Sequence, residues 1–280
     1  MNTTKDNHEL WNKSEHWHES IRAKLDGLLE TNQFANFEKC GKEVLFKSCA
    51  ECGKTEILTY RCSIRWCPRC NWRLARARSE MLTAWTRQIK QPKHLTLTQR
   101  NTDTFTRRTL RTHLKNLQRL RRSKFWKAAN VKGGCLSVEV TNETQGWHLH
   151  SHWLIDCRWM DAGKLAVEWG KIVGQDYAIV KVQDARARDY VLQVCKYVVK
   201  GNELAAWPAE QIHQFVNAIR GRRMFFVFGS LAQKTDAVKL QLAKGREHTH
   251  RICECGCDKF TLETEVASIL KEIRGRRRRR

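Results

Sequence analysis

The stretch from Gly146 to Asp156, GWHLHSHWLID, alternates histidines with other residues, and this alternation limits what the segment can fold into. On an extended strand, successive side chains point to opposite faces, so His148, His150 and His152 share one face. Imidazole is the commonest metal ligand in proteins, and three on one strand can hold a divalent ion while leaving positions open for a substrate. The simpler alternative is a half-exposed strand that binds no ion.

The preceding sequence favours a metal site. A second strand is expected from Cys135 to Thr141, and residues Asn142 to Gln145 would form the turn between the two strands. In such a hairpin, Glu139 lies across from His148 or His150 on the imidazole face. Two imidazoles and one carboxylate make an open site for Mg²⁺ or Mn²⁺, although imidazole also suits Zn²⁺.

The charge of the chain indicates its partner. The 280 residues include 52 Lys and Arg against 29 Asp and Glu, which gives a net charge of +23. Between Ile57 and Ser137 there are twenty basic residues and only two acidic ones. Such a field favours a polyanion, and nucleic acid is the expected one. The 41% hydrophobic composition is enough for one or two globular domains.

No apolar run is long enough for a membrane helix and the first residues do not resemble a signal peptide, so we expect a cytoplasmic protein with no membrane partner.

The cysteines indicate metal binding. Twelve cysteines in close pairs then favour metal sites over a disulfide scaffold. Two C-x2-C pairs have nearly the spacing of a zinc ribbon, with structural Zn²⁺ held most simply by Cys49, Cys52, Cys67 and Cys70.

Other cysteines extend this prediction. Cys40 and Cys62 could replace a member of that quartet or help to hold a second ion. The C-terminal part offers a candidate second zinc site of unusual spacing, whose ligands would be His248, His250, Cys253, Cys255 and Cys257.

Two expected helices carry candidate functional side chains. From Thr106 to Ala129, leucines repeat at helical spacing and the other face is basic, which predicts a surface that contacts DNA. Its candidate contacts are Arg107, Arg108, Arg111, Lys115, Arg119 and Arg122. Further helices are expected at 72–89, 161–173 and 204–221, and a buried strand at 224–231.

The second helix with candidate functional side chains is expected from Asp189 to Lys200. One face is apolar, and the opposite face carries Tyr190, Gln193, Lys196, Tyr197 and Lys200. Neighbouring cations favour the phenolate form of a tyrosine and also bind phosphate. The alternative is that the tyrosines only border the core and the lysines are solvated.

The order of the motifs resembles that of the plasmid rolling-circle replication initiator proteins, which are HUH endonucleases. The likeness runs from about Cys40 to Leu231 through CPRCNWRLARAR, the strand HLTLT, the EVT hairpin into HLHSHWLI, the helix CKYVVK and the strand FFVFGSL. It implies that His150 and His152 hold the divalent ion and that Tyr197 nicks origin DNA, which forms a 5′-phosphotyrosine link and frees a 3′-hydroxyl primer. Lys196 and Lys200 would steady the phosphate or the phenolate.

The resemblance also implies partners. These are plasmid origin DNA, both double-stranded and single-stranded, and a host helicase and polymerase, in a bacterial or archaeal cell. Two alternatives stay open at this point. One is a non-catalytic, zinc-containing DNA-binding regulator, and the other is a transposase or relaxase of the same superfamily.

One position departs from the family pattern. Family members often carry a Glu one helical turn before the tyrosine, as the base that activates water at termination. Here that residue is Gln193, whose amide cannot take up a proton at neutral pH. Tyr190, two turns before Tyr197 on the same face, is a candidate second nucleophile for termination.

The expected fold is α+β. It has a central antiparallel sheet built from HLTLT, CLSVEVT, HLHSHWLI and AIVKVQ, with flanking helices and with the tyrosine helix beneath the metal face. The expected units are an N-terminal helical segment (1–35), a zinc module with a basic helix (36–90), an HUH-like nicking and strand-transfer domain (91–232), and a C-terminal Cys/His segment with an Arg-rich tail (233–280).

Overall fold

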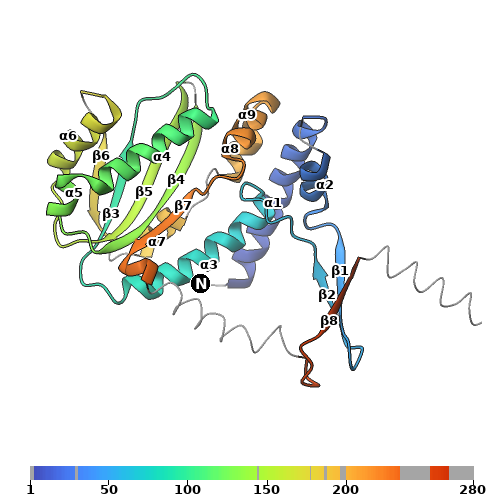
Figure 1. Ribbon diagram of the computed structural model, residues 1–280. Helices are drawn as coiled ribbons and strands as arrows, with labels where there is room; N and C mark the ends of the chain where they lie inside the picture. The colour runs from blue at the N-terminus through green and yellow to red at the C-terminus, as the bar shows by residue number, and fades with distance from the viewer. Residues whose placement is uncertain are drawn as a thin grey trace, which may run out of the picture.

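The computed structural model describes residues 3–28, 31–143, 145–176, 178–185, 188–195, 200–233 and 253–264. These residues form two antiparallel sheets and the helices that surround them (Figure 1). The helices are α1 (Thr3–Leu25), α2 (Thr31–Lys39), α3 (Pro68–Thr86), α4 (Arg107–Arg122), α5 (Lys124–Ala128), α6 (Ala162–Val173), α7 (Arg188–Cys195), α8 (Gly201–Ala206) and α9 (Ala209–Ile219). The strands are β1 (Val44–Cys49), β2 (Thr55–Thr59), β3 (Pro92–Thr98), β4 (Gly133–Glu143), β5 (Gly146–Asp156), β6 (Val180–Asp184), β7 (Phe225–Gly229) and β8 (Phe260–Thr264).

The larger sheet has the strand order β6-β3-β5-β4-β7. It contains the four expected strands, and β7 joins it at the edge beside β4. The mixed α+β class predicted from the sequence is therefore confirmed. The hairpin of β4 and β5 is longer than expected, because pairing continues to Glu143 and Gly146 and shortens the turn to the two residues between them.

The two faces of β5 pack against different helices. Trp147, Leu149 and Trp153 are buried in the same core as the leucines of α4. Leu154 lies on the opposite face, in a second core with residues of α7 such as Val191 and Val194. Since side chains alternate along a strand, the histidines of β5 share the face that α7 covers. Figure 1 shows α4 crossing the other face.

Several expected helices end earlier than the sequence pattern suggests. The basic helix stops at Ser123, which caps the C-terminus of α4 and whose hydroxyl accepts a hydrogen bond from the Trp126 backbone N–H to start α5. The helix expected at 204–221 is divided at Pro208 into α8 and α9. Proline has no backbone N–H to donate, so it begins α9 and does not continue α8.

Only part of the expected tyrosine helix is described. Helix α7 is described from Arg188 to Cys195, and Lys200 caps the N-terminus of α8. Residues 196–199, which include Lys196 and Tyr197, lie outside the described part of the chain. The apolar face is confirmed, because Val191, Val194 and Cys195 of α7 are all buried.

The smaller sheet has the order β2-β1-β8 and joins distant parts of the sequence. Strand β8 pairs with β1, with Leu45 opposite Thr264 and Cys49 opposite Phe260. The C-terminal Cys/His segment therefore shares a sheet with the N-terminal cysteine module. Among the described residues, no helix is both long and apolar enough to cross a membrane.

Candidate metal sites and the histidine face

The hairpin of β4 and β5 brings three potential ligands together. Glu139 lies directly opposite His150, and Ser137 lies opposite His152. Opposed residues of antiparallel strands share a face, so the carboxylate lies beside both imidazoles. The ligand atoms of Glu139, His150 and His152 all lie within 4.8 Å of one another. We call these three residues the triad.

Burial and charge leave Glu139 and His150 in the forms that bind a cation. The pKa of the Glu139 carboxyl is raised by burial but lowered more by its 2.9 Å hydrogen bond with His152 and by Lys200, so the net shift is downward and the carboxylate is charged. Burial and the neighbouring His148 lower the pKa of His150 to about 4, so this imidazole is neutral at neutral pH. Neutral imidazole and ionised carboxylate are the forms that bind metal.

The hydrogen bonds around the triad also fit an ion. Within the described part of the chain, Glu139 Oε1 and His152 Nδ1 are buried and have no hydrogen-bond partner. The Lys200 ammonium lies 3.9 Å from Glu139 Oε1, at the edge of ion-pair distance. A buried carboxylate oxygen without a full partner costs free energy unless a cation neutralises it. Two imidazoles and one carboxylate suit Mn²⁺, and Mg²⁺ where water completes the shell.

His148 does not join the triad, although the alternating pattern placed it on the same face. Its Nδ1 is hydrogen-bonded to Asn101 Oδ1, and its ring packs edge-on against His150, with ring centroids 4.0 Å apart. Of the four side chains expected as ligands, Glu139, His150 and His152 come together and His148 does not join them. Asn101 lies beyond the end of β3, and no pattern in the sequence predicts that it meets His148.

An aromatic stack continues from the triad to α7. His94 of β3 is fully buried, and its ring stacks on His152 with centroids 5.8 Å apart. Tyr190 of α7 also stacks on His94, with ring centroids 5.2 Å apart. His94 was not predicted as part of the site, although it lies two residues from Thr96, which pairs with His152. The same alternation that aligned the histidines of β5 could have placed His94 on this face.

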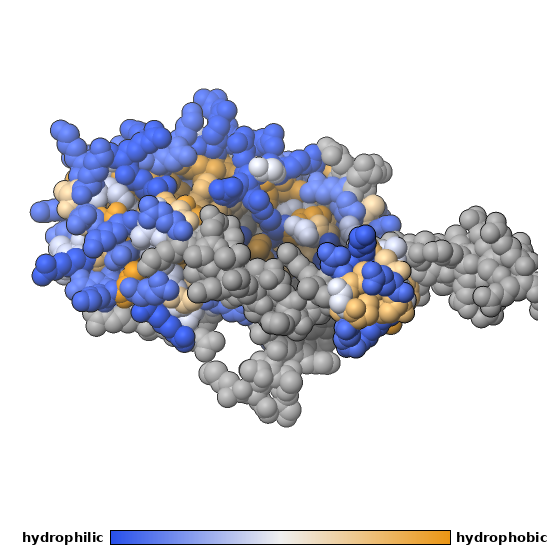
Figure 2. Space-filling model, turned by 60° about the horizontal axis from the view of Figure 1, so that its bottom comes forward, coloured by the Kyte–Doolittle hydropathy of each residue, from blue (hydrophilic) through white to orange (hydrophobic). Residues whose placement is uncertain are grey.

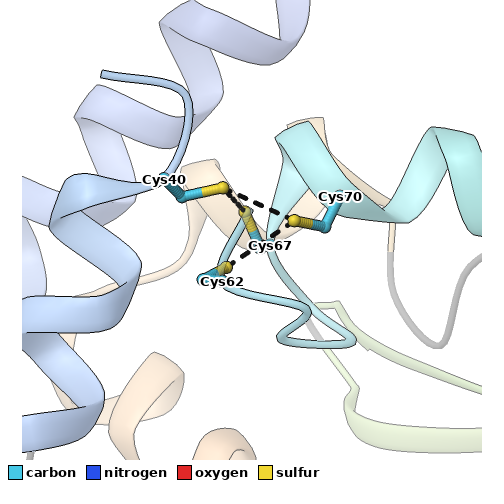
Figure 3. Close-up of side chains that lie close together, drawn as sticks. All are labelled: Cys40, Cys62, Cys67 and Cys70. Carbon is cyan, nitrogen blue, oxygen red and sulfur yellow. Dashed lines mark hydrogen bonds between the residues drawn. The ribbon is translucent and has the colours of Figure 1, made fainter. Parts of the chain in front are cut away.

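The cysteines form two groups, and neither is the quartet expected from the sequence. Cys40, Cys62, Cys67 and Cys70 make up the first group (Figure 3). The sulfur atoms of Cys40 and Cys70 lie 3.4 Å apart, and those of Cys62 and Cys70 lie 3.7 Å apart. A tetrahedral ion with Zn–S bonds of about 2.3 Å requires sulfur separations of about 3.8 Å. The first group therefore has the size of a closed zinc site.

The pKa values of the thiols in the first group show why a bound ion would stabilise it. Hydrogen bonds from Cys62 and Cys67 lower the pKa of Cys40, whereas burial raises the pKa of Cys67. Four thiolates cannot coexist in a buried space unless a cation offsets their charge. The group is packed firmly, because the buried Arg69 donates to the Cys40 carbonyl and to Glu15 of α1.

The second group contains Cys49, Cys52, Cys253 and Cys255. The sulfur atoms of Cys49 and Cys255 lie 3.6 Å apart, and those of Cys52 and Cys253 lie 3.4 Å apart. Hydrogen bonds from the Cys52 and Glu51 backbone lower the pKa of Cys49 to about 6, against the raising effect of burial. Figure 2 shows the tip of the β1-β2-β8 sheet as a hydrophobic patch surrounded by hydrophilic residues.

The hairpin of β1 and β2 explains why the expected quartet does not form. Cys49 and Cys52 flank the turn at its tip, whereas Cys40 precedes β1 and Cys62 follows β2 at its base. Because β1 has six residues, tip and base are on the order of 20 Å apart at about 3.3 Å per residue. Each C-x2-C pair therefore takes its partners from its own end of the hairpin.

The C-terminal ligands differ in part from those expected. Cys253 and Cys255 belong to the second group, but Cys257 does not, although it is buried nearby and its sulfur accepts a hydrogen bond from the Lys259 backbone N–H. His248 and His250 lie outside the described residues.

The basic side chains of α4 lie on the side of the sheet opposite the triad. Arg107, Arg108, Arg111, Lys115, Arg119 and Arg122 are exposed. Helix α4 packs on the face of the sheet opposite the triad, so this basic surface points away from it. Two of these six side chains donate hydrogen bonds to main-chain carbonyl groups. Arg107 donates to the carbonyl of Arg220, and Arg119 donates to the carbonyl of Ile172.

Comparison with known families identifies the class of protein. Residues 57–271, more than half of the chain, match the model of the Rep_1 family, described as Replication protein. The chain belongs to this replication protein family. The family supports the expected role in plasmid replication, with origin DNA as the partner. No curated protein and no solved structure matches the chain.

Proposed function

We propose that this replication protein initiates plasmid replication by nicking one strand of origin DNA with Tyr197. The observation that carries the proposal is the triad, in which two imidazoles and a charged carboxylate converge on the sheet face that α7 covers. In the sequence, Tyr197 comes two positions after Cys195, the last described residue of α7. Its own position lies outside the described part of the chain, so its role rests on the sequence and on the family.

The reaction is a transfer of a phosphoryl group from one oxygen to another. The Tyr197 oxygen forms a bond to phosphorus while the bond from phosphorus to the 3′ oxygen breaks. The phenolic proton passes to solvent, and the released 3′ oxygen takes up a proton. A divalent ion held by Glu139, His150 and His152 polarises the phosphodiester when it is bound. The new 3′-hydroxyl primes synthesis, and the 5′-phosphotyrosine keeps the bond energy needed to reseal the strand.

The charged groups near the triad support the same chemistry. The Lys200 ammonium lies close to Glu139 and hydrogen-bonds Glu203 at 2.6 Å. A cation at that place offsets the negative charge of a DNA phosphate. We assign Lys200 and Lys196 to phosphate binding.

Termination needs a second transfer, and Gln193 cannot supply the base for a hydrolytic one. Gln193 lies in α7, but the position of its side chain is not described. We propose that Tyr190 attacks in this second step. Its ring is connected to the triad through His94, with which it stacks.

The test is a covalent-adduct assay. The protein is incubated with Mn²⁺ and a labelled single-stranded oligonucleotide from the origin of the plasmid that encodes it. We expect an adduct that survives denaturation, is absent with EDTA and is absent for Tyr197→Phe. DNA binding without any adduct would overturn the nicking proposal and leave a zinc-containing DNA-binding regulator.

A further inference from the structure

A polar pocket lies beside the triad at one end of the larger sheet. Its volume is about 520 Å³, and it is lined by the residues that follow β3, by the turn of the β4-β5 hairpin and by the loop before β6. Polar side chains in the lining include Gln99, Arg100, Asn101, Gln145, Gln175 and Asp176. Ligand pockets in proteins have volumes of about 300 to 1,000 Å³, so a single nucleotide unit fits such a space.

Two contacts connect this pocket to the triad. Thr98, which lines the pocket, pairs directly with His150 across β3 and β5. His148, which also lines it, packs against the ring of His150. A strand of DNA whose phosphate contacts the triad would therefore pass the mouth of the pocket.

Hydrogen bonds hold the walls of the pocket in place. Thr102 and Trp147 exchange two backbone hydrogen bonds of 2.9 and 2.8 Å, which join the segment after β3 to the hairpin. Asn101 Nδ2 donates to the Gln145 carbonyl at 3.2 Å. Gly146, with φ +91°, allows this approach, because a Cβ there would lie 2.8 Å from the Thr102 carbonyl oxygen. A site fixed in this way loses little entropy when it binds a ligand.

A buried histidine fixes one of the amides. His113 Nδ1 is hydrogen-bonded to Gln99 Oε1 at 2.8 Å, and His113 is fully buried. Because the amide oxygen of Gln99 is held by His113, its NH2 group is left as a donor at the pocket wall. The side chains of Arg100, Gln175 and Asp176 make no hydrogen bond or ion pair within the described residues, so they can bind a ligand without breaking an existing contact.

The chemistry of this lining matches a nucleobase. Amides offer both donors and acceptors and can form paired hydrogen bonds with a base edge. A carboxylate accepts from exocyclic amino groups, and a guanidinium donates to ring nitrogens and carbonyls. Such edges are accessible only where a base is unpaired. A phosphate ligand fits less well, because Asp176 places a negative charge at the pocket.

We infer that this pocket binds one unpaired nucleobase next to the scissile phosphate, and that Gln175 and Asp176 read its identity. The inference rests on the proposed nicking function and adds a determinant of sequence specificity to it. Asn101 and Gln99 are positioning residues in this scheme, because their amides also hold His148 and His113.

The experiment uses a pool of single-stranded oligonucleotides with random sequence. The full-length protein is incubated with the pool and Mn²⁺, the covalently attached DNA is recovered, and its sequence is read relative to the nick. For the parent protein we expect a base preference at one or more positions. In Gln175→Ala/Asp176→Ala we expect the preference at one position beside the nick to fall about tenfold, while the other positions keep theirs.

Matched variants serve as controls. Asp103→Ala and Gln118→Ala remove the same kinds of side chain from exposed places that do not line the pocket, and both should keep the parent preference. If folding of the double variant is impaired, each single substitution is tested in its place. An unchanged preference in the pocket variants, or a uniform loss over all positions, overturns the inference alone. Failure of the parent to form any adduct overturns the nicking proposal, and the pocket inference falls with it.

Discussion

Tyr190 stacks on His94 with ring centroids 5.2 Å apart, and this contact connects α7 to the triad through His152. Tyr190→Phe keeps the ring and therefore the stack, but it removes the hydroxyl. We expect this variant to form the first adduct at the parent rate and to lose most of the second strand transfer. The measurement is closure of a circular product by the purified protein. Circles formed as fast as with the parent protein would exclude Tyr190 as the second nucleophile.

Substitution of Glu139 tests the ligand set of the triad. Glu139→Gln removes the negative charge and keeps the size of the side chain, so we expect Mn²⁺ affinity to fall at least tenfold and adduct formation to fall with it. His148→Gln changes a neighbouring side chain outside the triad and should affect Mn²⁺ affinity less. Calorimetric titration with Mn²⁺ measures both. Equal losses in the two variants would mean that His148 is also a ligand.

Zinc content distinguishes the two cysteine groups from the quartet expected from sequence spacing. We expect two zinc ions per chain in the parent protein, one in Cys62→Ser and one in Cys253→Ser, because each substitution removes a ligand from a different group. Cys157→Ser changes a buried cysteine outside both groups and should retain two. The measurement is metal analysis of the purified protein after dialysis. Two ions in Cys62→Ser would contradict the first group.

The stability of the protein should depend on pH through His113. Burial, with His150 and His148 nearby, lowers the pKa of His113 to about 3, whereas an unfolded histidine titrates near about 6.5. Between these values the unfolded chain binds a proton that the folded protein does not. The contribution of this group is therefore complete above about pH 6.5 and is lost as pH falls, by about 1.4 kcal/mol per pH unit.

The matching measurement compares urea unfolding of the parent protein and His113→Leu from pH 6 to pH 4. We expect the variant to be less stable at pH 6, because it loses the hydrogen bond to Gln99, but to lose less stability as pH falls. The same dependence on pH in both proteins would show that His113 is not the group responsible. Other buried histidines such as His18 contribute equally to both proteins and cancel in the comparison.

The basic face of α4 should bind duplex DNA independently of nicking. Arg111→Gln/Lys115→Gln removes two exposed cations on the side of the sheet opposite the triad. We expect the slope of log affinity for duplex DNA against log salt concentration to become shallower by about 2, with the nick position unchanged. Arg87→Gln/Lys90→Gln has the same charge change at exposed positions after α3 and should leave the slope nearer that of the parent. Equal effects of both pairs would mean that only net charge matters.

Local patterns predicted the strands of the larger sheet and placed Glu139 near the histidines of β5. The alternation in HLHSHWLI and the nearby CLSVEVT left Glu139 opposite His148 or His150, and the register of the hairpin in the structure pairs it with His150. The apolar spacing in α7 likewise predicted which residues are buried. These features depend on residues close in sequence, where periodicity is informative.

Contacts between distant segments could not be predicted in the same way. The cysteine spacing suggested one quartet, but the length of the β1-β2 hairpin separates Cys49 from Cys67 and leaves each to find other partners. No spacing rule connects Cys52 to Cys253 or Asn101 to His148, because these pairs meet only when the whole chain has folded. The break at Ser123 was missed because its hydroxyl caps a helix within a strongly helical pattern.

The pairing of β8 with β1 has a consequence for synthesis of the protein. Cys52 and Cys253 are 201 residues apart, so the ribosome releases Cys49 and Cys52 long before Cys253 and Cys255 have been translated. During that interval Cys49 and Cys52 lack the partners that complete the second cysteine group. A nascent chain or a prematurely terminated product would carry the triad without strand β8 and without that group. The pairing of β8 with β1 and the complete second cysteine group therefore distinguish a fully translated protein from a shortened one.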